Sequence, residues 1–127
     1  MAQSARSLEG ARILVVEDNF LAAEVVRDVL ERSGYTVIGP VGRVAQGLQL
    51  AQQEKLDGAV LDVNLNGDRC FPIAHALGSR GVPFMFLTGY DSSAMIPADL
   101  QGVRRLGKPV LEHQLIDALR ELIPVRT

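Results

Sequence analysis

Polar side chains stand at the ends of several short apolar runs in this sequence. In chain order they are Glu17 and Asp18, Asp62, Thr88 and Lys108. If the fold brings these ends together, the three carboxylates repel one another and raise each other's pKa unless a cation neutralises them. A site rich in carboxylate oxygen, without sulfur or histidine, suits a hard cation such as Mg²⁺. The set therefore indicates a magnesium site.

The other two groups of the set favour a phosphoryl ligand. Thr88 offers a hydroxyl donor and Lys108 a mobile ammonium, and with Mg²⁺ they satisfy the oxygens of a phosphoryl group. Asp62, in the middle of the set, is the candidate nucleophile and would form an aspartyl phosphate. Two plainer interpretations stay open: Asp18 could be only a helix N-cap, and Thr88 an ordinary strand-end residue. Glu17 beside Asp18 favours function, because a cap needs only one acceptor.

The elements that would position these groups follow from the hydrophobic pattern. Strand-length apolar runs alternate with stretches of helical periodicity, whose apolar faces lie at 22–30, 44–51, 71–77 and 115–123. Strands are predicted at 12–16, 36–41, 58–62, 83–87 and 103–107. This alternation implies right-handed crossovers and a parallel sheet covered on both faces. The predicted fold is α/β, a doubly wound five-stranded parallel sheet in the order 2-1-3-4-5, with ligands at its carboxyl edge.

The pattern weakens between the fourth and fifth strands. Residues 91–102 contain Pro97 and little periodicity, so the fourth helix is expected to be short or degenerate. The fifth strand holds Arg104 and Arg105, whose charges fit an edge position better than a central one.

Composition bounds the class of protein. The 127 residues fit one domain, expected at 12–124 with a flexible leader at 1–11 and a tail at 125–127. A formal net charge of −2 gives no basic footprint, so nucleic-acid binding by bulk electrostatics is not expected. The single Cys70 excludes an intrachain disulfide, and no apolar run has signal-peptide or membrane-spanning character. These features predict a cytoplasmic protein with no membrane partner.

The polar residues at the predicted strand ends resemble those of a known family. Glu17-Asp18, Asp62, Thr88 and Lys108-Pro109, each at a predicted strand end and in this order, resemble the receiver domain of bacterial two-component response regulators. The resemblance runs from about residue 12 to residue 123. It implies that Asp62 accepts a phosphoryl group from a sensor histidine kinase or a histidine phosphotransfer protein.

The resemblance also implies roles for the other residues. Glu17, Asp18, Asp62 and the backbone carbonyl of Asn64 would hold Mg²⁺, directly or through water. Thr88 and Lys108 would bind the phosphoryl oxygens, and the bond from Lys108 to Pro109 is usually cis in the family.

A narrower resemblance concerns output. Residues 83–90 resemble the PFxFATGY signature of the FAT GUY receivers, mostly small stand-alone regulators, although Leu87 stands where alanine is usual. Receivers usually carry a switch aromatic three residues before the lysine, where this sequence has Arg105. We therefore expect Tyr90 to relay the signal, with simple packing at the surface as an equal alternative. Arg105 and Pro109 are the other candidates for the switch or the partner surface.

The leading hypothesis is a stand-alone, phosphorylation-dependent signalling switch that catalyses only its own phosphorylation and dephosphorylation, with an unknown output protein. One alternative is a Mg²⁺-dependent phosphohydrolase with Asp62 as nucleophile. Such enzymes commonly need a second carboxylate two residues later, and here that residue is Asn64. Another alternative is a receiver fragment of a larger hybrid kinase or regulator.

Overall fold

The computed structural model describes residues 10–89 and 95–123. Its main sheet is parallel and has five strands in the order β2-β1-β3-β6-β7, which confirms the predicted order because β6 and β7 are its fourth and fifth strands. The strands are β1 (Arg12–Val16), β2 (Thr36–Val41), β3 (Gly58–Asp62), β6 (Phe84–Thr88) and β7 (Arg105–Gly107). The last strand lies at an edge, as its arginines predicted.

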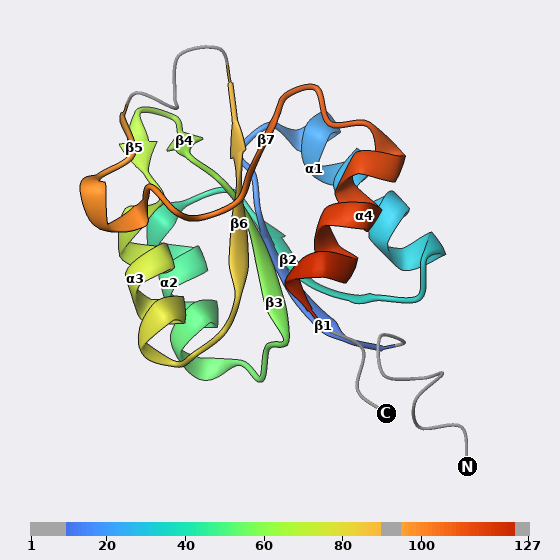
Figure 1. Ribbon diagram of the computed structural model, residues 1–127, viewed down its shortest axis with the longest axis horizontal. Helices are drawn as coiled ribbons and strands as arrows, with labels where there is room; N and C mark the ends of the chain where they lie inside the picture. The colour runs from blue at the N-terminus through green and yellow to red at the C-terminus, as the bar shows by residue number, and fades with distance from the viewer. Residues whose placement is uncertain (1–9, 90–94, 124–127) are drawn as a thin grey trace.

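Helices cover both faces of the sheet. The helices α2 and α3 lie on one face and α1 and α4 on the other (Figure 1). Their bounds are α1 (Phe20–Arg32), α2 (Val44–Gln53), α3 (Phe71–Ser79) and α4 (Glu112–Leu122). The start of α1 is fixed by Asn19, whose side chain accepts a hydrogen bond from the Ala22 N–H at 2.8 Å.

Successive side chains of each strand point to opposite faces of the sheet, which divides the interior into two hydrophobic clusters. In β1, Leu14 and Val16 face α2 and α3, whereas Ile13 and Val15 face α1 and α4. All residues of β3 are buried, as expected for the central strand of a parallel sheet. This burial makes β3 a rigid support for the residue at its carboxyl end, Asp62.

A small hairpin follows β3 that the sequence pattern did not resolve. Strands β4 (Asn64–Leu65) and β5 (Asp68–Arg69) pair antiparallel. The connecting residues Asn66 and Gly67 have φ angles of 54° and 92°, as a two-residue hairpin turn requires. The hairpin lies at the same end of the sheet as the end of β6 (Figure 1).

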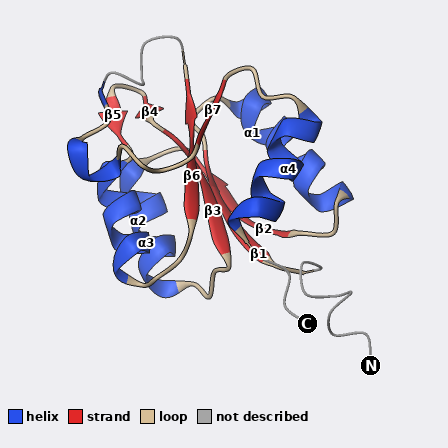
Figure 2. Cartoon of the chain, viewed as in Figure 1, coloured by secondary structure: helices blue, strands red, loops and turns tan. Residues whose placement is uncertain are grey.

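The region before β7 contains little regular structure. The described residues there include the short 3₁₀ helix η2 (Ala98–Leu100), in agreement with the predicted degenerate fourth helix (Figure 2). Ile96 and Leu100 are buried in the cluster that contains Phe86. The hydrogen bond from Val103 N–H to Leu100 O closes the following turn, and the fifth strand begins at Arg105 rather than at 103.

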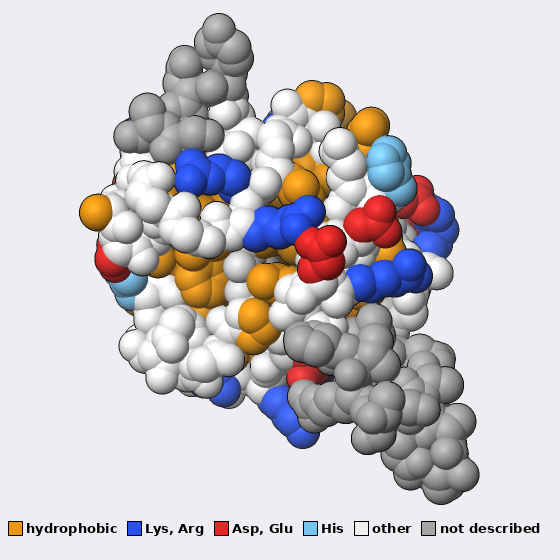
Figure 3. Space-filling model, viewed as in Figure 1, with side chains coloured by type: hydrophobic (Ala, Val, Ile, Leu, Met, Phe, Trp, Pro, Cys, Tyr) orange, Lys and Arg blue, Asp and Glu red, His pale blue; other side chains and the backbone are white. Residues whose placement is uncertain are grey.

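The described surface carries charges of both signs. Figure 3 shows basic and acidic side chains close to one another on the visible face. Several charged side chains of the described residues are paired, as Arg27 is with Glu24 and Glu31. No helix within 10–89 or 95–123 combines the length and apolarity that a membrane span needs.

Candidate functional site

The carboxyl ends of the strands bring the three predicted acidic residues together. Glu17 and Asp18 directly follow β1, and Asp62 is the last residue of the neighbouring strand β3. One carboxylate oxygen from each lies within 4.8 Å of the others. Glu17 and Asp62 are each only 3% exposed, whereas Asp18 is partly exposed. The cluster therefore has a buried base and an accessible rim.

The predicted lysine reaches the base of this cluster. The Lys108 Nζ lies 2.9 Å from Glu17 Oε1 and 3.0 Å from Asp62 Oδ2. Its backbone is fixed by the pairing of β6 with β7, which leads to a hydrogen bond from Lys108 N–H to Thr88 O at 2.9 Å. The peptide bond between Lys108 and Pro109 is cis, as the resemblance implied.

Backbone N–H groups hold each carboxylate from another side. Asn19 N–H donates to Glu17 Oε2 at 3.1 Å, and Asn64 N–H donates to Asp62 Oδ1 at 3.3 Å. The Asp18 Oδ2 accepts a hydrogen bond of 2.9 Å from the N–H of Asn66, in the hairpin turn. These donors were not identified from the sequence, since any non-proline residue supplies an N–H and only the fold decides where it points.

Residues 13–120 match the response regulator receiver domain. The chain belongs to this family. Among curated relatives it is similar to the sensory transduction protein LytT of Bacillus cereus, with 29% identity over 113 residues, 87% of this chain and 46% of the relative. It is also similar to the positive alginate biosynthesis regulatory protein of Pseudomonas aeruginosa, with 31% identity across 86% of this chain and 46% of the relative. This receiver thus spans slightly less than half of these proteins.

Solved structures agree with this assignment. SdrG from Sphingomonas melonis Fr1 superposes with a TM-score of 0.78 at 35% identity, covering 88% of this chain and 95% of SdrG. A second match is the receiver domain of a sensor histidine kinase from Pseudomonas aeruginosa PAO1, which has magnesium coordinated in its active site cleft. It superposes with a TM-score of 0.73 at 26% identity, covering 90% of this chain and 98% of that domain. The narrower FAT GUY resemblance of residues 83–90 stays a prediction.

The electrostatics of the receiver site are dominated by excess negative charge. Burial and, after it, the hydrogen bonding and charge of Glu17 raise the pKa of Asp62 to about 7, against the opposing effect of Lys108. Burial by itself lowers the pKa of Lys108, but Glu17 and Asp62 together outweigh it, and the net shift is upward. Lys108 is therefore cationic at neutral pH, while the raised pKa of Asp62 means that its carboxylate is partly protonated there.

The donor set fits Mg²⁺. Glu17 Oε1 is buried and accepts no hydrogen bond from the described residues, and its close cation is the Lys108 ammonium. Three carboxylates face one ammonium, so a divalent cation would complete the charge balance. All the candidate ligand atoms are oxygens, the donors that Mg²⁺ prefers. The geometry therefore favours Glu17, Asp18 and Asp62 as magnesium ligands, and the backbone carbonyl of Asn64 stays a predicted ligand.

Thr88 lies where the phosphoryl hypothesis requires a hydroxyl. It ends β6, beside Asp62 at the end of β3, and is 6% exposed. Its Oγ1 donates a long hydrogen bond of 3.4 Å to Leu106 O. A bond of that length is weak, so a stronger acceptor near Asp62 can compete for this hydroxyl.

The three predicted switch or partner residues have different outcomes. Tyr90 lies outside the described residues. Arg105 is half-buried and its Nη2 donates to Gln101 O at 3.1 Å and Gln101 Oε1 at 3.3 Å, which links β7 to the turn after η2. Pro109 is exposed and lines a cavity of about 150 Å³ with Glu17 and Lys108.

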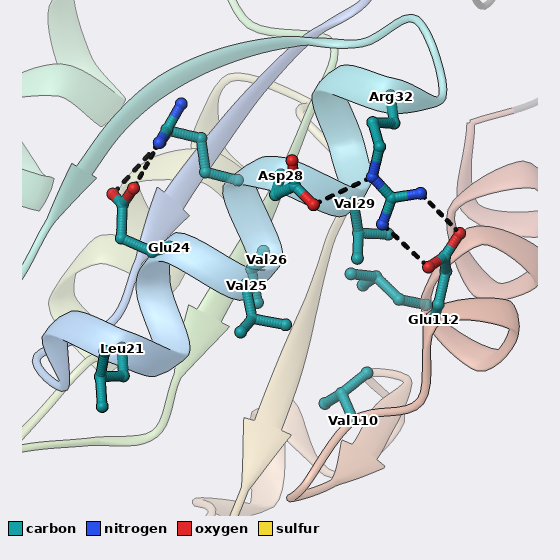
Figure 4. Close-up of a pocket in the computed structure, with 11 residues that line it drawn as sticks. Leu21, Glu24, Val25, Val26, Asp28, Val29, Arg32, Val110 and Glu112 are labelled. Atoms are coloured by element: carbon teal, nitrogen blue, oxygen red, sulfur yellow. Dashed lines mark hydrogen bonds and ion pairs between the residues drawn. The ribbon is translucent and has the colours of Figure 1, made fainter.

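An open groove runs between α1 and α4 beside this cavity. Figure 4 shows its apolar lining from both sides, including Leu21, Val25 and Val110. Arg32 bridges Asp28 and Glu112 within the groove. Val25 and Val110 also line the small cavity that contains Lys108, so the groove and the receiver site share residues.

Proposed function

We propose that this receiver is a phosphorylation-dependent signalling switch in which Asp62 accepts the phosphoryl group. Magnesium-dependent phosphorylation of an aspartate is general in the family. The observation that carries the proposal is the position of Asp62, which lies with Glu17 and Asp18 on one side and Lys108 on the other. This arrangement provides a nucleophile, a cation site and an ammonium for the developing phosphate.

The transfer consists of one displacement. A carboxylate oxygen of Asp62 forms a bond to phosphorus while the bond from phosphorus to the donor's imidazole nitrogen breaks, and that nitrogen keeps the electron pair. When bound, Mg²⁺ supplies positive charge to the phosphoryl oxygens and keeps the carboxylates ionised. Lys108 transfers its contact from the Asp62 carboxylate to a phosphoryl oxygen, and the Thr88 hydroxyl donates to another. Glu17 and Asp18 complete the cation site.

A phosphohistidine on a helical donor suits the surface around the site. Phe20, Leu21 and Val25 of α1 are 75%, 74% and 58% exposed, which is unusual for large apolar side chains. They lie in the first two turns of α1, which begins two residues after Asp18. A sensor histidine kinase or phosphotransfer protein that packs on them places its histidine over Asp62. A protein is also the proposed output partner, since a formal net charge of −2 gives no basic footprint for nucleic acid.

The chain acts on its own aspartate rather than as a phosphohydrolase. In a hydrolase that uses Asp62, the residue two positions later would be the acid or base, and here it is Asn64. Its Oδ1 accepts hydrogen bonds from the Gly67 N–H and from Arg69, so its side chain serves the hairpin. We propose that the receiver domain extends over residues 12–124. We also propose that it functions in the cytoplasm, where the free, buried Cys70 stays reduced.

The proposal is tested by intact mass after incubation with Mg²⁺ and acetyl phosphate. We expect one acid-labile phosphoryl group on the wild-type chain and none on Asp62→Asn. Asp117→Asn is the matched control, because Asp117 is an exposed carboxylate on α4. Equal labelling of Asp62→Asn and the wild-type chain would falsify the assignment of the nucleophile.

A further inference from the structure

The β4–β5 hairpin directs two backbone N–H groups at the acidic cluster. Asn64 N–H donates to Asp62 Oδ1 at 3.3 Å, and Asn66 N–H donates to Asp18 Oδ2 at 2.9 Å. The two donors are separated by one residue, Leu65, which pairs with Asp68 across the hairpin. This spacing follows from the two-residue repeat of an extended chain, in which alternate N–H groups point to the same side.

The hairpin is held firmly enough to position these donors. Leu65 is only 2% exposed and packs in the cluster that includes Ile73 and Leu61. The Asn64 side chain closes the turn by accepting the Gly67 N–H at 2.9 Å. Arg69 donates to Gly67 O at 2.9 Å, which braces the turn from the second strand.

Asp18 depends on this hairpin more than the other acidic residues do. The Lys108 ammonium contacts Glu17 and Asp62, but in the described part of the chain no ion pair includes Asp18. Asp18 is also partly exposed, beyond the end of β1. The orientation of its carboxylate therefore has to come from hydrogen bonding, and the Asn66 N–H supplies it across 48 residues of sequence.

We propose that the β4–β5 hairpin is a positioning element for magnesium, in which the Asn66 backbone N–H fixes one oxygen of Asp18 and leaves the other directed at the cation. This inference rests on the proposed function and deepens it. A ligand that is oriented before the cation arrives loses less conformational freedom on binding, which raises affinity. Asn66 acts through its backbone, so its side chain is dispensable.

Gly67→Ala tests this proposal, because Gly67 has φ of 92° and a Cβ there meets no atom within 4 Å. The added methyl group therefore strains only the backbone of the turn and displaces the Asn66 N–H. Gly81→Ala is the matched control: Gly81 has φ of 71°, equally open surroundings and a place after α3. Both variants pay the same kind of conformational cost, but only Gly67 adjoins Asn66.

The measurement is a Mg²⁺ titration followed by NMR at the backbone amides, with melting temperatures of the metal-free proteins. We expect Gly67→Ala to weaken Mg²⁺ binding about tenfold, as outer partners of metal ligands typically do. Gly81→Ala should bind Mg²⁺ as the wild type does, while its melting temperature falls by about as much as that of Gly67→Ala. Asn66→Gly, which keeps the N–H and the positive φ, should also bind normally. In the metal-free protein, Asp18→Ala should move the Asn66 amide proton upfield.

Each other outcome overturns the proposal. Unchanged or tighter Mg²⁺ binding by Gly67→Ala removes the role of the hairpin. An equal loss in Gly81→Ala assigns the effect to general destabilisation, and an equal loss in Asn66→Gly assigns it to the Asn66 side chain. If the chemical shift of the Asn66 amide proton is unchanged in Asp18→Ala, the hydrogen bond itself is contradicted. Failure of the wild-type chain to bind Mg²⁺ is distinguishable from all of these, because it overturns the proposed function.

Discussion

Lys108 and Asp62 form an ion pair, with 3.0 Å between Nζ and Oδ2, across 46 residues of sequence. The same ammonium lies 2.9 Å from Glu17 Oε1. Two carboxylates thus share one compact cation, and phosphorylation of Asp62 would convert one of them into an acyl phosphate. Phosphorylation of Asp62 would therefore change the contacts of Lys108 directly.

Lys108→Arg tests this role. A planar guanidinium keeps the charge but replaces the compact ammonium, whose single nitrogen contacts both carboxylates, by a wider and rigid fork. We expect Asp62 to be labelled by acetyl phosphate, while the amide shifts that accompany phosphorylation of the wild-type chain are largely lost. Lys55→Arg, at an exposed position, is the control. A wild-type pattern of shifts in Lys108→Arg would refute the prediction.

Asp18→Asn should weaken magnesium binding and phosphorylation together. The substitution removes one negative ligand, so Mg²⁺ affinity falls, while reduced repulsion with Glu17 and Asp62 leaves the metal-free fold at least as stable as the wild type. Titration with Mg²⁺ and thermal melting measure the two effects, with Asp117→Asn as control. If Mg²⁺ affinity is unchanged, the acidic pair is not part of the metal site.

The raised pKa of Asp62 predicts a pH dependence of stability in metal-free protein. Its pKa is about 7 in the folded chain and 3.8 without the fold, so the folded state binds more protons between these values. The contribution of Asp62 is thus fully present below the lower value and is lost as pH rises through the upper one. At pH 8, Asp62→Asn should be more stable than the wild type by about 1–2 kcal/mol, well below the full linkage value because the amide also loses the ion pair with Lys108.

Urea unfolding at pH 5 and pH 8 measures this difference. Saturating Mg²⁺ should reduce it, since the cation favours the ionised carboxylate that the proton otherwise neutralises. Equal stability gains for Asp62→Asn at both pH values would show that the carboxylate does not titrate in this range.

Arg105 should hold the segment before β7 in place. Its guanidinium donates to Gln101, and the Gln101 Nε2 donates in turn to Ile96 O at 2.6 Å. Arg105→Ala should therefore speed amide hydrogen exchange in residues 95–101 and leave Asp62 labelling intact. Arg104→Ala is the neighbouring control, because Arg104 pairs with Glu121 of α4 instead. Unaltered exchange in Arg105→Ala would remove the arginine from this role.

Tyr90 stays the predicted relay from Thr88 to the partner surface. Tyr90→Ala should leave Asp62 phosphorylation largely intact while reducing the gain in partner affinity that a stable phosphoryl mimic produces. Partner titrations with and without the mimic measure that gain. If Tyr90→Ala keeps the full gain and Arg105→Ala loses it, the arginine is the switch.

The local pattern of the sequence determined the helices and strands and the polar residues at the strand ends. The predicted ranges 36–41 and 58–62 coincide with β2 and β3, because strand-length apolar runs bounded by turn residues are readable within a short window. The alternation of elements then decided the sheet order and placed Asp62, Thr88 and Lys108 at one edge.

Tertiary structure alone decided how these groups are held. The contact of Asn66 N–H with Asp18, the double contact of Lys108 and the link from Arg105 to Gln101 carry no sequence signal. Backbone N–H groups are chemically alike in every residue, and long side chains reach several acceptors, so only the packed fold selects their partners. The sequence therefore determined which groups meet, and the close packing of the hairpin and of β7 against β6 determined the atoms through which they meet.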